Sequence, residues 1–229
     1  MTVSIDDTNQ NKMAVDDLQL AALLCSKLCH DLVSPAGAVV NGLEVLGEEQ
    51  DPAMRDQVMG LLNQSAAQTS SRLQFFRMAF GSGGSLGERV DANDVSRVLA
   101  SYMRDKKIEL DWRVGQPALA KPHIRVVLAL SLIAGEGLIR GGVLTVEDLP
   151  DDAAGYRITG RGERYILQEL IGNILTDGDE CFRAADVLPE PRFAPALLAA
   201  RVATGLGWTA TIAQPEENAV VLSVGALGV

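Results

Sequence analysis

The sequence has few cysteines and no long apolar run, and each shortage excludes a class of protein. Its three cysteines, Cys25, Cys29 and Cys181, are odd in number and unevenly spaced, which favours reduced thiols over a disulfide framework. No apolar run approaches the ~20 residues of a membrane span, and the N-terminus lacks the basic and then apolar pattern of a signal peptide. We therefore expect no membrane association and a cytoplasmic location.

Positive charge is also scarce. Lys and Arg number 20 against 30 Asp and Glu, which gives a formal net charge of −10. Such a field repels nucleic acid and anionic lipid, so neither is an expected partner. Hydrophobic residues make up 47% of the 229 residues, enough to bury the core of one large domain or two small ones.

The chain divides into four segments by composition. A polar tail over 1–14 is expected to be disordered, and a glycine- and serine-rich linker over 82–87 separates a helical hairpin over 15–81 from a second domain over 88–229. In the hairpin, leucines at four-residue steps from Leu20 to Leu32 form one apolar stripe. Pro35 kinks the first helix, and Asp51-Pro52 begins the second, which runs to Phe80.

Two helices cannot cover their own apolar faces in water. Pairing with a second copy would cover them, so we expect a homodimer built on a four-helix bundle. In the second domain, helices alternate with strands and predict an α/β sandwich, which makes the fold class α+β. Helices are expected over 92–104, 122–137, 163–175 and 195–204, strands over 108–114, 143–147, 156–159, 208–213 and 219–224, and a long loop over 176–193.

The hairpin contains His30, one of only two histidines in the chain. On an ideal helical wheel it lies roughly 140° from the centre of the leucine stripe, so it faces outward. The other histidine, His123, follows Lys121-Pro122 and is expected at the start of a helix. The Phe75-Phe76 and Phe80 cluster is expected to pack between the hairpin and the second domain.

The run Lys27-Leu28-Cys29-His30-Asp31-Leu32-Val33-Ser34-Pro35 resembles the phosphoacceptor box of histidine kinases. Together with Leu73-Gln74-Phe75, Arg77 and Ala79-Phe80-Gly81, it resembles more closely the ChpT family of bacterial histidine phosphotransferases. That resemblance implies a homodimer with a kinase-like dimerization hairpin and a degenerate domain similar to the kinase ATP-binding (Bergerat) fold. It also implies a role in a cell-cycle phosphorelay.

The second domain departs from the kinase pattern in its nucleotide boxes. Ser131 and Gly135 stand near the places where a kinase carries paired asparagines, and Thr159 rather than an aspartate precedes Gly160-Arg161-Gly162. The loop before the last helix lacks the glycine-rich pattern that holds phosphates. We expect no ATP binding, and Gly160-Arg161-Gly162 is interpreted as a turn.

The resemblance and the chemistry assign His30 as the phosphoacceptor. Asp31 orients the imidazole or takes its proton, and Ser34, one turn on, contacts the phosphoryl group or the partner. Lys27, one turn before the histidine, is a candidate to interact with an incoming anion, but the default interpretation is a solvated surface lysine. Arg77 is expected to brace the junction of the domains. The expected docking residues are Lys27, Leu28, Val33 and Arg77.

The expected reaction is transfer from a phosphoaspartate in the receiver domain of a hybrid histidine kinase to His30, and then to the receiver domains of response regulators. The chain needs no cofactor of its own, because Mg²⁺ is held by the receiver's acids. A metal site at Cys25, Cys29 and His30 is not expected, since no second pair of ligands exists. Two alternatives stay open: an ATP-dependent histidine kinase with diverged boxes, and a receiver-binding module without chemistry.

Overall fold

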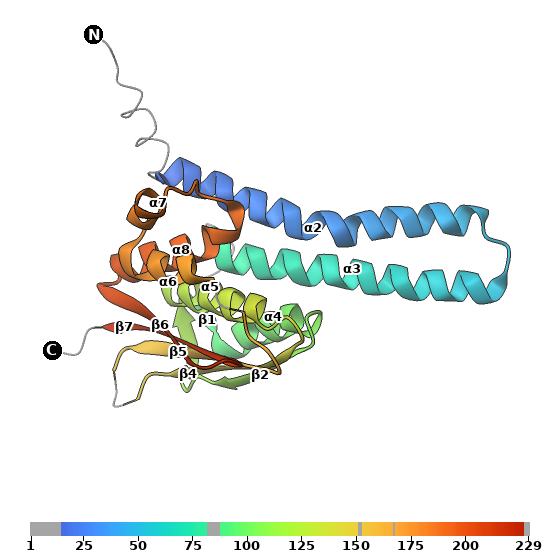
Figure 1. Cartoon of the computed structure of the whole chain (residues 1–229). Coiled ribbons are helices and arrows are strands. Elements are labelled where there is room, and N and C mark those ends of the chain that lie inside the picture. Colours follow the sequence, from blue (N-terminus) through green and yellow to red (C-terminus); the bar gives the residue numbers. More distant parts are fainter. Residues whose placement is uncertain (1–14, 82–87, 151–152, 167, 227–229) are drawn as a thin grey trace, which may run out of the picture.

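The computed structural model describes residues 15–81, 88–150, 153–166 and 168–226. A long helical hairpin extends from a domain in which helices cover one face of a β-sheet (Figure 1). The expected fold class, α+β with a hairpin followed by an α/β sandwich, is confirmed. The predicted tail over 1–14 and linker over 82–87 lie outside the described residues.

The hairpin consists of two antiparallel helices, α2 (Asp17–Glu48) and α3 (Pro52–Phe80). The Asp16 carboxylate accepts a hydrogen bond from the Gln19 N–H, and the Gln19 side chain accepts one from the Asp16 N–H, so a capping box fixes the start of α2. Asp51 caps α3 by accepting from the Ala53 N–H, with Pro52 in the first turn. The predicted start of the second helix is confirmed.

Helix α2 continues through Pro35, which is buried inside it. In Figure 1 its axis changes direction about midway, as expected where a proline crowds the preceding turn and removes one backbone hydrogen bond. The helix therefore resumes beyond the proline.

Helix α2 also corrects one expectation. By length and composition it can cross a membrane, with a mean hydropathy of 1.2 in its most apolar part, although no run of that kind was expected. One such helix is weak evidence for a span, because core helices of water-soluble proteins pass the same test. Here α2 packs along α3 and carries the ion-paired Lys27 and Asp31.

After the hairpin, helices and strands alternate. Five strands form one sheet in the order β2-β4-β5-β7-β6, in which only the β2–β4 pair is parallel, and β1 pairs with β3 in a separate two-stranded sheet. The strands are β1 (Arg89–Asp91), β2 (Ile108–Arg113), β3 (Ala118–Ala120), β4 (Gly142–Asp148), β5 (Gly155–Arg161), β6 (Trp208–Glu216) and β7 (Ala219–Ala226). The helices are α4 (Ala92–Arg104), α5 (Lys121–Gly137), α6 (Glu169–Asp177), α7 (Glu180–Ala185), α8 (Ala194–Gly205) and the 3₁₀ turn η1 (Pro191–Phe193).

Helix α5 is the centre of the sandwich core. It is apolar on nearly all sides from Ile124 to Ile133 because it lies between the sheet, α8 and α3. The hairpin joins this core through aromatic side chains of α3. Phe75 stacks on Tyr102 of α4 with ring centroids 4.1 Å apart, and Phe76 packs against both Tyr102 and Phe80. The expected packing role of the phenylalanine cluster is confirmed.

Two predicted elements were wrong in part, and one pair of strands was not predicted. The helix expected from residue 163 begins only at Glu169, because the preceding segment is bound to the end of α5: the Ile166 N–H donates to the Gly137 carbonyl at 3.0 Å. The loop expected over 176–193 contains α7 and η1, which Phe182 and Phe193 anchor in the core. The β1–β3 pair was missed, since strands of three residues leave almost no periodic signal.

His123 lies in the first turn of α5, as predicted. Its Nδ1 is 2.9 Å from the Tyr156 hydroxyl, and its ring packs on Trp208. Burial, and then the charge of Arg89, lower the pKa of His123 below its ordinary value. The folded protein therefore binds this proton less tightly than the unfolded chain does.

We expect this histidine to make stability pH-dependent. Because the pKa of His123 is lower in the folded state, the free energy of unfolding falls as the pH decreases from about 7.5 through the ordinary value of about 6.5. His123→Gln should flatten the profile between pH 7.5 and 5.5, measured by urea unfolding. A slope equal to that of the wild-type protein would contradict the assignment.

Candidate functional site

His30 lies at the surface of α2, with a side chain that is 87% exposed. The leucine stripe of the same helix faces the other way: Leu20 is buried, and Leu24 and Leu28 are half-buried against the core. The amphipathic pattern therefore presents the imidazole to solvent, as the helical wheel predicted.

Asp31 is next to His30 in sequence and also lies beside its ring. The His30 Nδ1 is 3.4 Å from the Asp31 Oδ1, which is longer than an ordinary hydrogen bond. Contacts of this kind are often loose before the reactants meet. With Nδ1 facing the carboxylate, Nε2 is the ring nitrogen that lies away from it.

Lys27 is not the solvated lysine that was expected. Its Nζ is buried, 2.8 Å from the Asp31 Oδ2 and 2.7 Å from the Glu136 Oε1 near the end of α5. Burial alone would lower the pKa of Lys27, but Glu136 and Asp31 outweigh it, so the net pKa is raised and the amine is held charged. The docking role expected of Lys27 is therefore corrected, because its ammonium group is already paired with the carboxylates of Asp31 and Glu136.

Pro35 explains an unusual contact at Asp31. In a regular helix the carbonyl of residue 31 accepts a hydrogen bond from the N–H of residue 35, and proline has none. Arg72 of α3 fills the gap, because its Nη1 donates to the Asp31 carbonyl. The two helices of the hairpin are thus tied together beside His30 by a bond that the proline makes necessary.

The other predicted site residues differ in their solvent exposure. Ser34 and Val33 are exposed on α2 close to His30, while Leu28 is half-buried and packs against the core. Arg77 is exposed on α3. The structure thus brings Lys27, Asp31 and His30 together; the roles expected of Ser34, Val33, Leu28 and Arg77 stay predictions.

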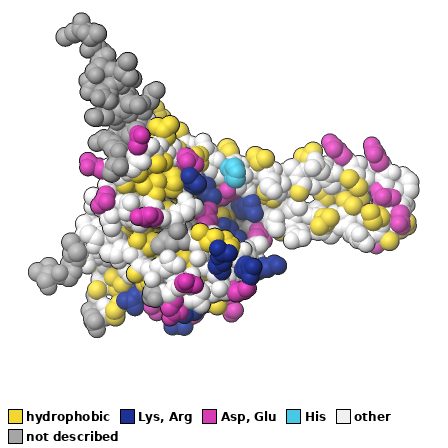
Figure 2. Space-filling view, in the orientation of Figure 1, with side chains coloured by type: hydrophobic (Ala, Val, Ile, Leu, Met, Phe, Trp, Pro, Cys, Tyr) yellow, Lys and Arg dark blue, Asp and Glu magenta, His cyan; other side chains and the backbone are white. Residues whose placement is uncertain are grey.

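Sequence reasoning missed Arg72 and Glu136. Pro35 was a signal that the Asp31 carbonyl needs a donor from elsewhere, but the sequence does not say which. Glu136 stands between Gly135 and Gly137 in α5, and no local pattern there predicts its contact with Lys27. Figure 2 shows basic and acidic side chains gathered where the hairpin meets the sandwich, beside an exposed histidine.

The places of the kinase nucleotide boxes are filled with packing residues. Ser131 is buried, and its hydroxyl oxygen has no hydrogen-bond partner in the described part of the chain. A Cβ at Gly135 would lie 2.8 Å from the Met103 sulfur, so α4 packs directly on the glycine. Gly160 and Arg161 belong to β5 rather than to a turn, which corrects the interpretation of Gly160-Arg161-Gly162.

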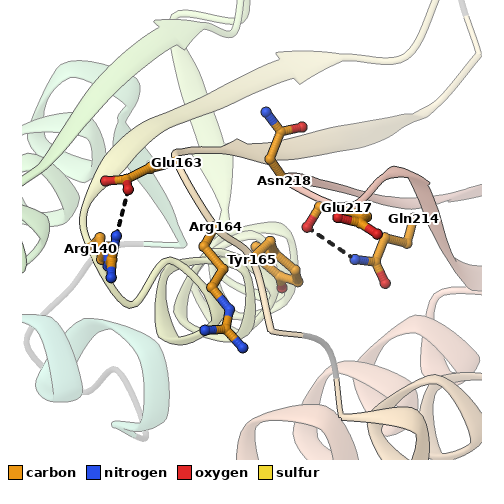
Figure 3. A pocket seen from close by; sticks show the side chains of 7 residues that line it. All are labelled: Arg140, Glu163, Arg164, Tyr165, Gln214, Glu217 and Asn218. Atoms are coloured by element: carbon orange, nitrogen blue, oxygen red, sulfur yellow. Dashed lines mark hydrogen bonds and ion pairs between the residues drawn. The ribbon is translucent and has the colours of Figure 1, made fainter.

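A polar cavity of about 820 Å³ lies beyond the end of β5 (Figure 3). Its two arginines are matched by two glutamates, and Arg140 and Glu163 form an ion pair at 2.5 Å. The lining therefore carries no excess positive charge for a polyphosphate. The residues that line it are Arg140, Glu163, Arg164, Tyr165, Gln214, Glu217 and Asn218.

The cysteines are free thiols: Cys25 and Cys29 are exposed, and Cys181 is buried. Within the described ranges, no three or more Cys, His, Asp or Glu side chains cluster in a way that could hold a metal ion.

Comparison with known proteins agrees with this arrangement. The family model of the histidine phosphotransferase C-terminal domain matches residues 92–218, which lie in the sandwich. Protein phosphotransferase ChpT of Brucella abortus (strain 2308) is 43% identical over 129 residues, or 56% of this chain and 60% of that protein. This chain therefore spans about 60% of the length of the curated relative it matches.

A solved structure described as a bacterial phosphotransferase matches with a TM-score of 0.76 at 30% identity. The match covers 92% of this chain and 98% of that one, so the likeness extends to the hairpin. The Acinetobacter baumannii histidine kinase AdeS matches at 12% identity with a TM-score of 0.39, over 87% of this chain and 98% of its own. That likeness is too low to support an inference.

The Arg72 contact can be tested by a double-mutant cycle with Pro35. Arg72→Met should lower the free energy of unfolding by about 1–3 kcal/mol, because it leaves the Asp31 carbonyl without its donor. In the Pro35→Ala background the same change should cost less, since the introduced alanine supplies the missing N–H. Urea unfolding of the four proteins measures the coupling, and Arg97→Met, which changes an arginine that is 75% exposed, is the control. Strictly additive costs would rule out this interpretation.

Proposed function

Because this chain belongs to the histidine phosphotransferase family, we propose that it relays phosphoryl groups between receiver domains through His30. The observation that carries the proposal is the geometry of His30: the imidazole is exposed, its Nδ1 faces the half-buried carboxylate of Asp31, and its Nε2 points away from that carboxylate. A histidine phosphoacceptor needs this combination, because one ring nitrogen must be accessible to the phosphoryl group while the other is hydrogen-bonded to an acceptor.

The transfer is an in-line displacement on an acyl phosphate. The Nε2 lone pair attacks the phosphorus of the receiver's phosphoaspartate, the bond between phosphorus and the aspartate oxygen breaks, and the carboxylate leaves with the electron pair. The imidazole keeps its proton on Nδ1 and gains positive charge. Asp31, at Nδ1, stabilises that charge. The reverse reaction passes the group to the aspartate of a response regulator.

The receiver supplies what the chain lacks. The charge spread over the phosphoryl oxygens is neutralised by Mg²⁺ bound to the receiver's own acidic residues. Ser34, Val33, Leu28 and Arg77 are the proposed contacts with the receiver. Val33 is 70% exposed and close to His30, which makes it the best placed apolar contact.

The source of the phosphate is proposed to be a hybrid histidine kinase rather than ATP. Ser131 is fully buried, a Cβ at Gly135 would meet Met103 and Ile108, and the polar cavity has balanced charges. These features give no support to the alternative of a kinase with diverged nucleotide boxes. The relay is proposed to operate in the cytoplasm, in a cell-cycle phosphorelay, with no nucleic acid or membrane as partner.

The hairpin also supports the proposed homodimer. Large apolar side chains are exposed along the part of the hairpin that extends beyond the sandwich, among them Leu43 at 59% and Leu61 at 63%. Soluble monomers rarely expose such a surface, and a second hairpin would cover it in a four-helix bundle. Each dimer would then present two His30 side chains.

The phosphotransfer is tested with an isolated receiver domain phosphorylated on its aspartate with ³²P. The wild-type protein should gain an acid-labile, base-stable label, His30→Gln should gain none, and His123→Gln, which changes the other histidine, should be labelled normally. An unlabelled wild-type protein, or a labelled His30→Gln variant, would sink the proposal. Labelled ATP alone should give no product; autophosphorylation would favour the kinase alternative.

The dimer is tested by sedimentation at micromolar concentration. Leu43 and Leu61 lie at the same level of the hairpin, since a Cβ at Gly42 would lie 2.7 Å from Leu62. Leu43→Glu/Leu61→Glu should therefore convert the dimer to a monomer, because charge would be buried in the bundle. Leu188→Glu, at an exposed apolar position of the sandwich, should leave the dimer intact. A monomeric wild-type protein would contradict the prediction.

A further inference from the structure

Glu136 of the sandwich contacts the phosphoacceptor site through Lys27. It is the residue before the end of α5, and its Oε1 is 2.7 Å from the Lys27 Nζ. The same Nζ is 2.8 Å and 3.1 Å from the two oxygens of Asp31. One ammonium group is therefore shared between a carboxylate of the hairpin and a carboxylate of the second domain.

Burial makes this sharing energetically important. The side chains of Lys27 and Asp31 are only 11% and 13% exposed, and that of Glu136 is 30% exposed. The charges of Lys27 and Asp31 are therefore weakly screened from each other and from the more exposed Glu136 in contact with Lys27. The three side chains together carry a net charge of −1, and without Glu136 the Lys27–Asp31 pair would be neutral.

The charge balance among Lys27, Asp31 and Glu136 affects the Asp31 Oδ1 in particular. This atom is 3.1 Å from the Lys27 Nζ and 3.4 Å from the His30 Nδ1, so the lysine and the histidine compete for it. A lysine that is also paired with Glu136 neutralises less of the negative charge of Asp31. The carboxylate then remains a stronger acceptor for an Nδ1–H.

We infer that Glu136 is a positioning residue: by sharing Lys27, it keeps Asp31 as the acceptor of the His30 Nδ1–H and so leaves Nε2 free to attack. The inference deepens the proposed function and rests on it. The imidazole has two neutral tautomers, and its second partner selects one of them. Glu136 affects the tautomer of His30 without contacting the ring.

Two other positively charged side chains, Arg72 and Lys106, lie near this network. Arg72 is bonded to the Asp31 backbone carbonyl, which fixes the backbone at that residue. Lys106 lies over the Tyr102 ring, whereas Lys27 directly contacts both carboxylates. Asp31 and Lys27 belong to the hairpin and Glu136 to the sandwich, so the tautomer depends on how the domains are docked.

The test uses the full-length protein labelled with ¹⁵N on its histidines. In the wild type, NMR shifts of the His30 ring should report a proton on Nδ1. Glu136→Gln should move the population toward Nε2–H and slow transfer from a phosphorylated receiver about tenfold, less than the ~10²-fold or more expected for loss of a catalytic base. Glu136→Asp should recover part of both effects.

Two further proteins separate positioning from a merely structural role. Glu163→Gln removes one charge from the same domain, at an exposed ion pair with Arg140. It should change neither the NMR shifts of the His30 ring nor the rate of phosphotransfer. Lys27→Met/Glu136→Gln removes the competitor as well, so the Nδ1–H tautomer should return; a structural role predicts a double variant worse than either single one.

Unchanged ring shifts and transfer rate in Glu136→Gln would overturn the inference, as would a double variant that stays in the Nε2–H form. An inactive wild-type protein with an intact Nδ1–H tautomer would instead count against the proposed function. The ring shifts do not depend on transfer, so the two failures are distinguishable.

Discussion

The missing N–H of Pro35 is the constraint on which the site depends. It leaves the Asp31 carbonyl without its helical partner, and Arg72 supplies the bond from the second helix. The side chain of the same aspartate lies beside His30 and is paired with Lys27. The backbone hydrogen bond that Pro35 cannot make is thus replaced by a hydrogen bond between the two helices, at the residue proposed to orient the imidazole.

The same region joins the hairpin to the sandwich. The aromatic contacts of Phe75 with Tyr102 supply the apolar part of the junction, and the Lys27–Glu136 ion pair supplies a polar part nearer to His30. The second domain is therefore part of the surroundings of the site. It covers the base of the hairpin, buries Lys27, and contributes a carboxylate to the network behind the proposed phosphoacceptor.

The elements that the sequence predicted well are those with strong local signals. The helix beginning at Asp51-Pro52 has a cap and a first-turn proline, and the helix over 92–104 is strongly amphipathic. The segment from residue 163 was predicted as helix because its composition allows one. Tertiary contact decided otherwise, since Ile166 is hydrogen-bonded to Gly137, a residue distant in sequence.

By itself, the sequence determined the hairpin, the outward direction of His30 and its acidic neighbour, because helical periodicity places these side chains relative to one another. Only the tertiary structure decided the state of Lys27. A lysine one turn before an aspartate looks solvated when its helix is considered alone. Burial by the second domain and the approach of Glu136, 109 residues further along the chain, convert it into a shared internal charge. The physical reason is that burial and charge balance are sums over every neighbour, and neighbours distant in sequence leave no local pattern.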